Sequence, residues 1–318
     1  MNNDEWIDEY GVMYSADKKR LIKGRYDLIE YQVIKGCEII SEKAFSYFPC
    51  DSIFSENGIP DGIIDFEGRH FKLCRQLQSI IIPESVTVIE KCAFEGCSKL
   101  KEVHLPKGLK AIGYCAFEDT DLEKFYIPDN VSEFKYPFSG CKKLQEIVCD
   151  NPYFQSINGV LFSKDLKTLL VYPPAKEDTE YNIPNSVITI GYSAFSSCHN
   201  LKKIHIPNSV KIIESEAFSG CDFQNIVIPN SVTTIDEFSF MACINLENIT
   251  IEKNITSIGR YAFYDCNKLV EIHCKNQIPP NIGDSCFEGV FNCKLYVPLG
   301  SKEAYQKAWW DFENIIEE

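Results

Sequence analysis

An aromatic residue, most often a Phe preceded by Ala, returns along this chain at a nearly constant interval. The intervals between neighbouring members are 26, 23, 23, 21, 57, 23, 22, 23 and 24 residues. Periods of this size are typical of solenoids, in which each coil buries its apolar face only against neighbouring coils. The sequence therefore predicts one repeat array along most of the 318 residues. The ten aromatic residues in this register are Phe45, Phe71, Phe94, Phe117, Phe138, Phe195, Phe218, Phe240, Phe263 and Phe287.

Each repeat also contains a segment in which apolar and variable residues alternate, as in Leu201 to Ile206. Alternation at period two is the pattern of a strand with one buried face. A proline follows this segment in most repeats, and it ends the strand because it has no N–H for the ladder. Equivalent strands of successive coils should then pair in parallel. We expect one long parallel β-sheet, with short 3-10, helical or extended segments on the opposite face.

Two segments interrupt or precede the array. Gly159 to Leu170 matches Gly11 to Ile22, because both carry Ser-x-Asp between two apolar runs. Both segments are predicted to be β-hairpins with polar tips. The first would cover the open face of the first coil, and the second accounts for the interval of 57 residues.

The C-terminal end should be closed by a cap, since the last coil has no neighbour. Ser301 is a good N-cap for a helix that continues to about Lys307. The residues beyond it form a concentrated apolar surface that we expect to cover the last coil: Trp309, Trp310, Phe312, Ile315 and Ile316. The expected organisation is an N-terminal capping hairpin (1–30), a first sub-array (31–149), a β-hairpin insertion (150–180), a second sub-array (181–298) and a C-terminal cap (299–318).

The charge composition bears on the possible partners. Lys and Arg number 32 and Asp and Glu number 46, so the net charge is -14. Such a chain repels phosphate backbones, and nucleic acid is not an expected partner. No apolar run approaches the roughly 20 residues of a membrane span. The first residues also lack the basic and apolar regions of a signal peptide. We therefore expect either a cytoplasmic protein or the mature part of a secreted one.

Seven of the fifteen cysteines lie three residues after a register aromatic: Cys74, Cys97, Cys141, Cys198, Cys221, Cys243 and Cys266. Stacked coils place equivalent Cβ atoms about 4.8 Å apart with parallel directions. A disulfide needs about 3.8 Å and converging directions. We expect this ladder to consist of buried free thiols that pack as small hydrophobic side chains. No Cys-x-x-Cys pair is present, so neither a metal site nor a cofactor is predicted.

The full frame is Leu-x-x-Ile-x-Ile-Pro-x-x-Val-x-x-Ile-x-x-x-Ala-Phe-x-x-Cys, and it is clearest from Leu77 to Cys97. This frame resembles the BspA-like leucine-rich repeats over residues from about Tyr31 to Pro298. The resemblance implies the right-handed superhelix of a leucine-rich-repeat solenoid. It also implies a surface or secreted protein, because the better-understood members of the family are surface or secreted proteins of bacteria and some parasitic protists, implicated in adhesion to host proteins and cells.

Strand alternation directs two columns of side chains onto the open face of the sheet. Three of the five histidines, His104, His205 and His273, share one column with aromatic residues. A common metal is not expected, because His205 and His273 are three coils apart, or about 14 Å. This mixture of aromatic, imidazole and charged groups is typical of a protein-binding face. The candidate ligand-binding residues are Glu102, His104, Lys124, Tyr126, Lys203, His205, His273 and Tyr296.

No combination of nucleophile, base and oxyanion donors can be assembled from the motifs, so an enzyme is not expected. We expect a monomeric, non-catalytic interaction module, with a surface or secreted adhesion role, that binds a protein or glycan ligand along the sheet face. One alternative is an intracellular leucine-rich-repeat scaffold or recognition protein that uses the same surface. Another is that the face is merely solvated and its aromatic residues support cross-strand pairing.

Overall fold

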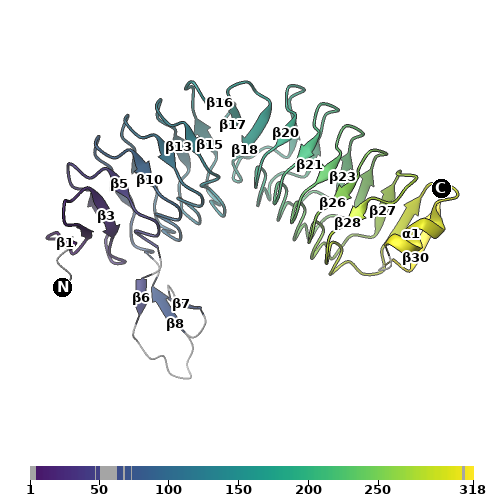
Figure 1. The fold of residues 1–318 in the computed structure, drawn as a ribbon, viewed down its shortest axis with the longest axis horizontal. Coiled ribbons are helices and arrows are strands. Elements are labelled where there is room, and N and C mark those ends of the chain that lie inside the picture. The colour runs from purple at the N-terminus through teal and green to yellow at the C-terminus, as the bar shows by residue number, and fades with distance from the viewer. Residues whose placement is uncertain (1–4, 47, 51–62, 67–68, 73, 310–311) are drawn as a thin grey trace. The chain divides into compact units, whose positions relative to one another are not determined.

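The structure is a computed structural model, and it describes residues 5–46, 48–50, 63–66, 69–72, 74–309 and 312–318. The chain forms two compact units, Met1–Tyr153 and Phe154–Glu318, which are described one at a time. Both are β-solenoids (Figure 1). Each coil contributes one short strand of two residues and one longer strand of three or four residues. These two sets are called the short-strand ladder and the long-strand face.

In the first unit, the short-strand ladder begins with an antiparallel meander, in which β1 pairs with β2 and β2 with β3. It continues in parallel through β5, β10, β12 and β14. Its strands are β1 (Glu5–Ile7), β2 (Met13–Ser15), β3 (Arg20–Lys23), β5 (Ile39–Ile40), β10 (Val88–Ile89), β12 (Ala111–Ile112) and β14 (Glu133–Phe134). The long-strand face consists of β4 (Glu30–Gln32), β9 (Ser79–Ile81), β11 (Glu102–His104), β13 (Lys124–Tyr126) and β15 (Glu146–Val148).

The second unit repeats this plan. An antiparallel meander, β16 (Phe154–Ile157), β17 (Val160–Ser163) and β18 (Thr168–Val171), opens its short-strand ladder. The ladder continues through β20 (Thr189–Ile190), β22 (Ile212–Ile213), β24 (Thr234–Ile235), β26 (Ser257–Ile258) and β28 (Asn281–Ile282). The long-strand face consists of β19 (Glu180–Asn182), β21 (Lys203–His205), β23 (Asn225–Ile228), β25 (Asn248–Ile251), β27 (Glu271–Cys274), β29 (Lys294–Val297) and β30 (Asn314–Glu317).

The predicted solenoid, its two hairpins and its C-terminal helix are confirmed, with one difference in the sheets. The long strands were expected to form one continuous sheet. They are instead grouped as β4-β9-β11, β13-β15, β19-β21 and β23-β25-β27-β29-β30. The longest parallel ladder is the short-strand ladder on the other side of each coil. Two residues per coil suffice there because every coil adds its pair at the same register.

The register aromatics stack face to face as predicted. In the second unit, neighbouring ring centroids from Phe195 to Phe287 are 5.1 to 5.3 Å apart, and all five rings are buried. The first unit contains the same spine, with Phe45 on Phe94 at 5.2 Å and Phe94 on Phe117 at 5.3 Å. One ring from each coil therefore forms a continuous apolar column along each unit.

The assignment of Phe71 to this register is wrong. Phe71 lies in β8 (Arg69–Lys72), which pairs with β6 (Phe48–Cys50) and β7 (Ile63–Phe66) in a separate antiparallel sheet. Phe45 stacks directly on Phe94 in its place. The segment between Ser46 and Cys74 is thus an insertion, and Pro60, which was expected to end a strand, falls outside the described residues. Phe71 is 26 residues after Phe45 and 23 residues before Phe94, so the insertion had the spacing of a coil in the sequence.

Tyr172 also belongs to the spine, although it was not predicted from the repeat pattern. Its ring stacks on Phe195 at 5.1 Å, and its N–H donates to Ala194 O, just as the N–H of Phe195 donates to Ala217 O of the next coil. The matching position after the first hairpin is Gly24, whose N–H donates to Ala44 O. A Cβ on Gly24 would lie 2.2 Å from the Phe45 ring, so only glycine fits there.

The cysteine ladder has a role beyond packing. The fourteen cysteines whose side chains the structure describes are buried and have free thiols. Each ladder thiol donates a hydrogen bond to the carbonyl of the preceding coil, as Cys221 does to Phe195 O at 3.0 Å and Cys243 to Phe218 O at 3.2 Å. A cysteine fits this place because it combines small volume with a weak donor. Thr120 takes the same place in its coil and donates to Phe117 O.

We expect close to 15 titratable thiols when the protein is unfolded in denaturant without reductant, because the ladder geometry holds neighbouring thiols parallel. The measurement is a colorimetric thiol count on protein purified under air. The same count after reduction is the control. A count near one before reduction would reveal a disulfide network and would contradict this arrangement.

The C-terminal cap contains α1 (Lys302–Ala308), which begins after Ser301 as predicted. Trp309 and Tyr305 are fully buried, and the Trp309 ring packs on Phe287 with centroids 5.3 Å apart. Phe312 and Ile315 are also buried, whereas Trp310 lies outside the described residues. Ile315 and Ile316 were predicted only as apolar surface, but they lie in β30, which pairs in parallel with β29.

Candidate functional site

The outward columns of the long-strand face form networks between coils. In the first unit, Lys124 Nζ lies 2.7 Å from Glu146 Oε2 on the neighbouring strand and 5.1 Å from the centroid of the Tyr126 ring. The hydrogen bond to Glu146 raises the pKa of Lys124, so this side chain stays cationic. The Tyr126 side chain is 61% exposed although Lys124 lies beside it. An exposed ring held by a neighbouring cation is a preorganised contact surface.

His104 lies apart from this group. It is on β11, which pairs with β9, whereas Lys124 and Tyr126 are on β13, which pairs with β15. The expected neighbours on two adjacent strands therefore belong to two different sheets. His104 Nε2 is 3.9 Å from Glu102 Oε2 on its own strand. Its paired residue on β9 is Ile81, which is itself 45% exposed.

In the second unit, Lys203 and His205 converge on one carboxylate. Glu180 Oε1 lies 2.8 Å from His205 Nε2 and 3.2 Å from Lys203 Nζ. Hydrogen bonds from His205 and Lys203 lower the pKa of Glu180, which favours its ionised form. Glu180 was not among the residues predicted from the sequence. It occupies the same strand position as Lys203 in the preceding coil, so the strand register contained the signal.

His273 and Tyr296 form a third group at the C-terminal end of this face. Their rings are parallel, with centroids 4.4 Å apart, and the strands that carry them pair directly. His273 Nδ1 lies 2.9 Å from Glu318 Oε1, and Tyr296 Oη donates to Glu271 Oε1 at 3.3 Å. Glu318 could not have been selected from the repeat pattern, because β30 lies beyond the last repeat.

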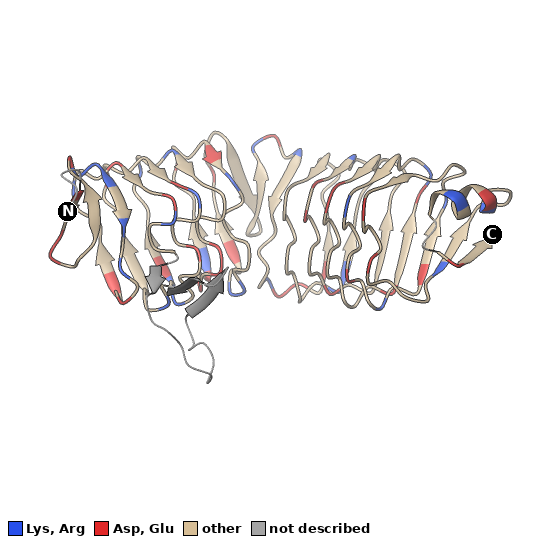
Figure 2. Cartoon of the chain, turned by 60° about the horizontal axis from the view of Figure 1, so that its bottom comes forward, with Lys and Arg blue, Asp and Glu red and all other residues tan. Residues whose placement is uncertain are grey.

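The eight candidate residues therefore occur in separate groups. In two groups a carboxylate bridges cationic or imidazole partners, since Glu180 contacts Lys203 and His205, and Glu271 contacts Lys294 and His273. Basic and acidic positions are interspersed along each unit (Figure 2). Among the described residues, no three His, Cys, Asp or Glu side chains are placed to hold a metal ion. The described part of the chain also contains no helix with the length and apolar character needed to cross a membrane. What the face offers is polar and aromatic contact area.

The repeats of this chain match those of a known protein family. A model of the BspA type leucine-rich repeat region matches residues 24–145, 64–173 and 175–294, with six copies. This chain belongs to the BspA-type leucine-rich repeat family. Among curated proteins, none matches the chain.

Solved structures show the same leucine-rich-repeat fold. A leucine-rich repeat protein from Eubacterium ventriosum ATCC 27560 is 21% identical with a TM-score of 0.68, covering 93% of this chain and 82% of that one. A leucine rich cell surface protein from Faecalibacterium prausnitzii A2-165 is 23% identical with a TM-score of 0.65, covering 96% and 88%. The pneumococcal vaccine antigen PcpA is 19% identical with a TM-score of 0.63, covering 99% and 98%. At these identities the likeness concerns the fold alone.

Proposed function

We propose that this BspA-type repeat protein is a non-catalytic binding module that recognises a protein or glycan ligand on its long-strand face. The observation that carries the proposal is the Tyr126 ring, which stands 61% exposed beside a paired lysine. Ile81 in the same outward column is 45% exposed, and Val227 at the equivalent strand position of the second unit is 55% exposed. Aromatic side chains are enriched in the cores of protein interfaces, and they supply much of the binding energy there.

The proposed setting is the cell surface or the extracellular space, where the module would act in adhesion. This part of the proposal is supported by the printed descriptions of two similar structures, a cell surface protein and a vaccine antigen. The family frame, present over most of the chain, supports a repeat module that binds other molecules. The charged groups of the face would give specificity, because each charge that a ligand covers must be matched by a group of opposite sign.

Combined alanine substitutions at Tyr126, Lys124 and His104 are expected to weaken binding by about 2 kcal/mol or more, because aromatic anchors in a shielded contact dominate affinity. Calorimetry with a purified partner, first isolated by pull-down, measures this loss. The melting temperature should stay unchanged, since these side chains lie outside the core. Tyr153→Ala is the matched control, an exposed tyrosine of the same unit outside the outward column. Unchanged affinity of the triple variant would contradict the assignment of the binding site to the long-strand face.

A further inference from the structure

Neighbouring coils are joined at the Ala-Phe turn by three hydrogen bonds from alternate residues. In the coil of Phe263, the three N–H groups belong to Tyr261, Phe263 and Asp265. They donate to the next coil at Asp284 O (3.1 Å), Cys286 O (2.8 Å) and Glu288 O (2.9 Å). The preceding coil does the same, with N–H groups of Phe238, Phe240 and Ala242. A turn of this type therefore presents three aligned donors toward the C-terminal end of the unit.

In the last coil these donors belong to Ser285, Phe287 and Gly289. Within the described part of the chain, none of the three N–H groups has a hydrogen-bond acceptor. The cap provides donors for carbonyls elsewhere in the coil, since Tyr305 Oη donates to Asn276 O at 2.9 Å and Trp309 Nε1 to Pro280 O at 3.0 Å. Among its described residues, the cap brings no acceptor to the three N–H groups of Ser285, Phe287 and Gly289. Because unpaired backbone donors are costly when they are shielded from water, this turn is suited to accept a partner.

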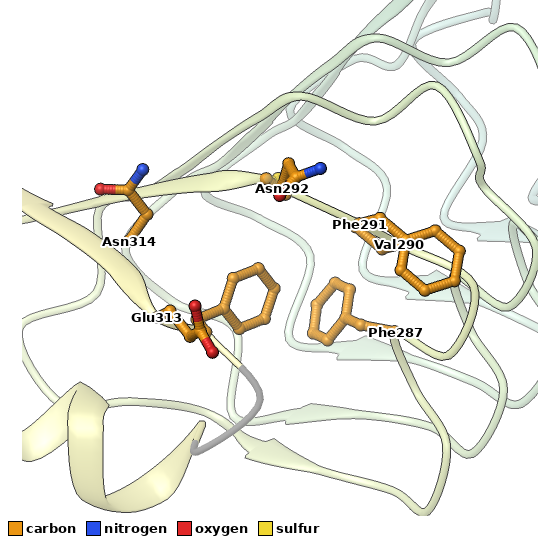
Figure 3. A pocket seen from close by; sticks show the side chains of 8 residues that line it. Phe287, Val290, Phe291, Asn292, Glu313 and Asn314 are labelled. Carbon is orange, nitrogen blue, oxygen red and sulfur yellow. The ribbon is translucent and has the colours of Figure 1, made fainter.

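A cavity of about 550 Å³ adjoins the same turn. Phe287, Val290 and Phe291 line it from the last coil, and Glu313 and Asn314 line it from the segment after α1 (Figure 3). Phe291 is 71% exposed, although a large apolar ring is normally covered. Cavities of this size hold small ligands or single side chains of a bound peptide. The site thus combines apolar walls with aligned backbone donors.

The charges around the turn restrict what can bind. Asp284, Glu288 and Glu313 are exposed and acidic, and the whole chain carries a net charge of -14. An anion would be repelled, although backbone N–H groups otherwise favour anions. Uncharged carbonyl oxygens accept the same hydrogen bonds without repulsion. Lys or Arg side chains beside them would be attracted by the carboxylates.

We propose that the turn Ser285 to Gly289 and its cavity bind an extended segment of a partner protein. Backbone carbonyls at alternate positions of that segment accept from the N–H groups of Ser285, Phe287 and Gly289. An apolar side chain enters the cavity, and a flanking Lys or Arg approaches Glu288 and Glu313. Peptide addition to an unpaired backbone edge is a recurring recognition mode, in which the main chain gives affinity and pockets give specificity.

A second copy of this chain is not the favoured occupant. Its N-terminal coil would have to supply the carbonyls of Glu42, Ala44 and Ser46. Two of these already accept hydrogen bonds, because Gly24 N–H donates to Ala44 O at 2.7 Å and Lys23 Nζ to Ser46 O at 2.6 Å. End-to-end association would have to break both bonds.

Amide hydrogen exchange tests the donors directly in the full chain. Ser285, Phe287 and Gly289 are expected to exchange much faster than Tyr261, Phe263 and Asp265, whose N–H groups are bonded to the next coil. The probe is the acetylated and amidated hexapeptide Gly-Arg-Tyr-Ala-Phe-Tyr, which copies residues 259–264. Saturating probe should slow the exchange of the three amides of the last coil. Equal protection of both sets in the free protein would overturn the proposal.

Binding of the same peptide, measured by fluorescence anisotropy, tests the cavity and the charges. Phe291→Ala and Glu313→Lys are each expected to lower affinity by about tenfold, and exchanging the peptide Arg for Glu should do the same. Leu299→Ala is the matched control, because Leu299 is 74% exposed and does not line the cavity. No binding, or binding unaffected by these changes, would refute the site. Self-association of the free chain that Phe291→Ala abolishes would assign the site to a second copy instead.

Discussion

Phe218→Ala is expected to lower the free energy of unfolding by about 3 to 5 kcal/mol, because it removes a buried ring and leaves a cavity. The Phe218 ring is fully buried between Phe195 and Phe240, at centroid distances of 5.2 and 5.1 Å, and it also meets the edge of Phe223. In a repeat array the loss is shared with neighbouring coils, since each coil is stabilised mainly by the adjacent ones.

Urea denaturation followed by circular dichroism measures the change. The matched control is Val227→Ala in the following strand, whose side chain is 55% exposed and whose loss should cost less than about 0.5 kcal/mol. A loss under about 1 kcal/mol for Phe218→Ala would show that this ring does not belong to the spine.

Stability is expected to fall steeply as the pH rises from about 9 toward 12. Burial raises the pKa of Cys141 from 9.0 to about 12, and burial also raises the pKa of Cys221 and Cys243. In the folded state these three thiols therefore keep their protons at a pH where the unfolded thiols have lost theirs. With raised pKa values in the folded state, the stabilisation is complete below pH 9 and is lost above it. Each such thiol contributes about 1.4 kcal/mol per pH unit within this range.

The measurement is the urea midpoint between pH 8 and 11, with reductant present and ionic strength held constant. Cys221→Ala should lower the slope of the free energy of unfolding against pH by about 1.4 kcal/mol per pH unit, because one proton fewer is released on unfolding. The control is the same variant at pH 7, which reports the packing loss alone. A midpoint that does not depend on pH above 9 would contradict the burial of the ladder thiols.

The sequence pattern was sufficient to predict the solenoid, because a coil must place its apolar residues at fixed points to bury them. Phe94, Phe117 and Phe218 lie where the frame predicts. Phe71 does not, since an insertion of nearly one repeat length preserved the apparent period. Tyr172 was overlooked because it is a tyrosine within the predicted hairpin insertion (150–180), although its place in the stack is the same.

The candidate face was predictable only in part. Alternation along a strand shows which side chains point outward, and this placed Lys124 and Tyr126 on one strand. It does not show how strands group into sheets, so the separation of His104 from Tyr126 could not be foreseen. Partners from beyond the repeats, such as Glu318 beside His273, depend on where the terminal segment folds back.

The direct stacking of Phe45 on Phe94 has a consequence for how such a chain can vary. Two residues 49 positions apart meet as if they belonged to adjacent repeats. The junction between these coils therefore tolerates a guest sequence. The entropy of closing such a loop grows only with the logarithm of its length, by about 0.6 kcal/mol per doubling. New modules could be acquired at this junction, or an affinity tag or reporter domain introduced by an engineer, while the host stack keeps its register.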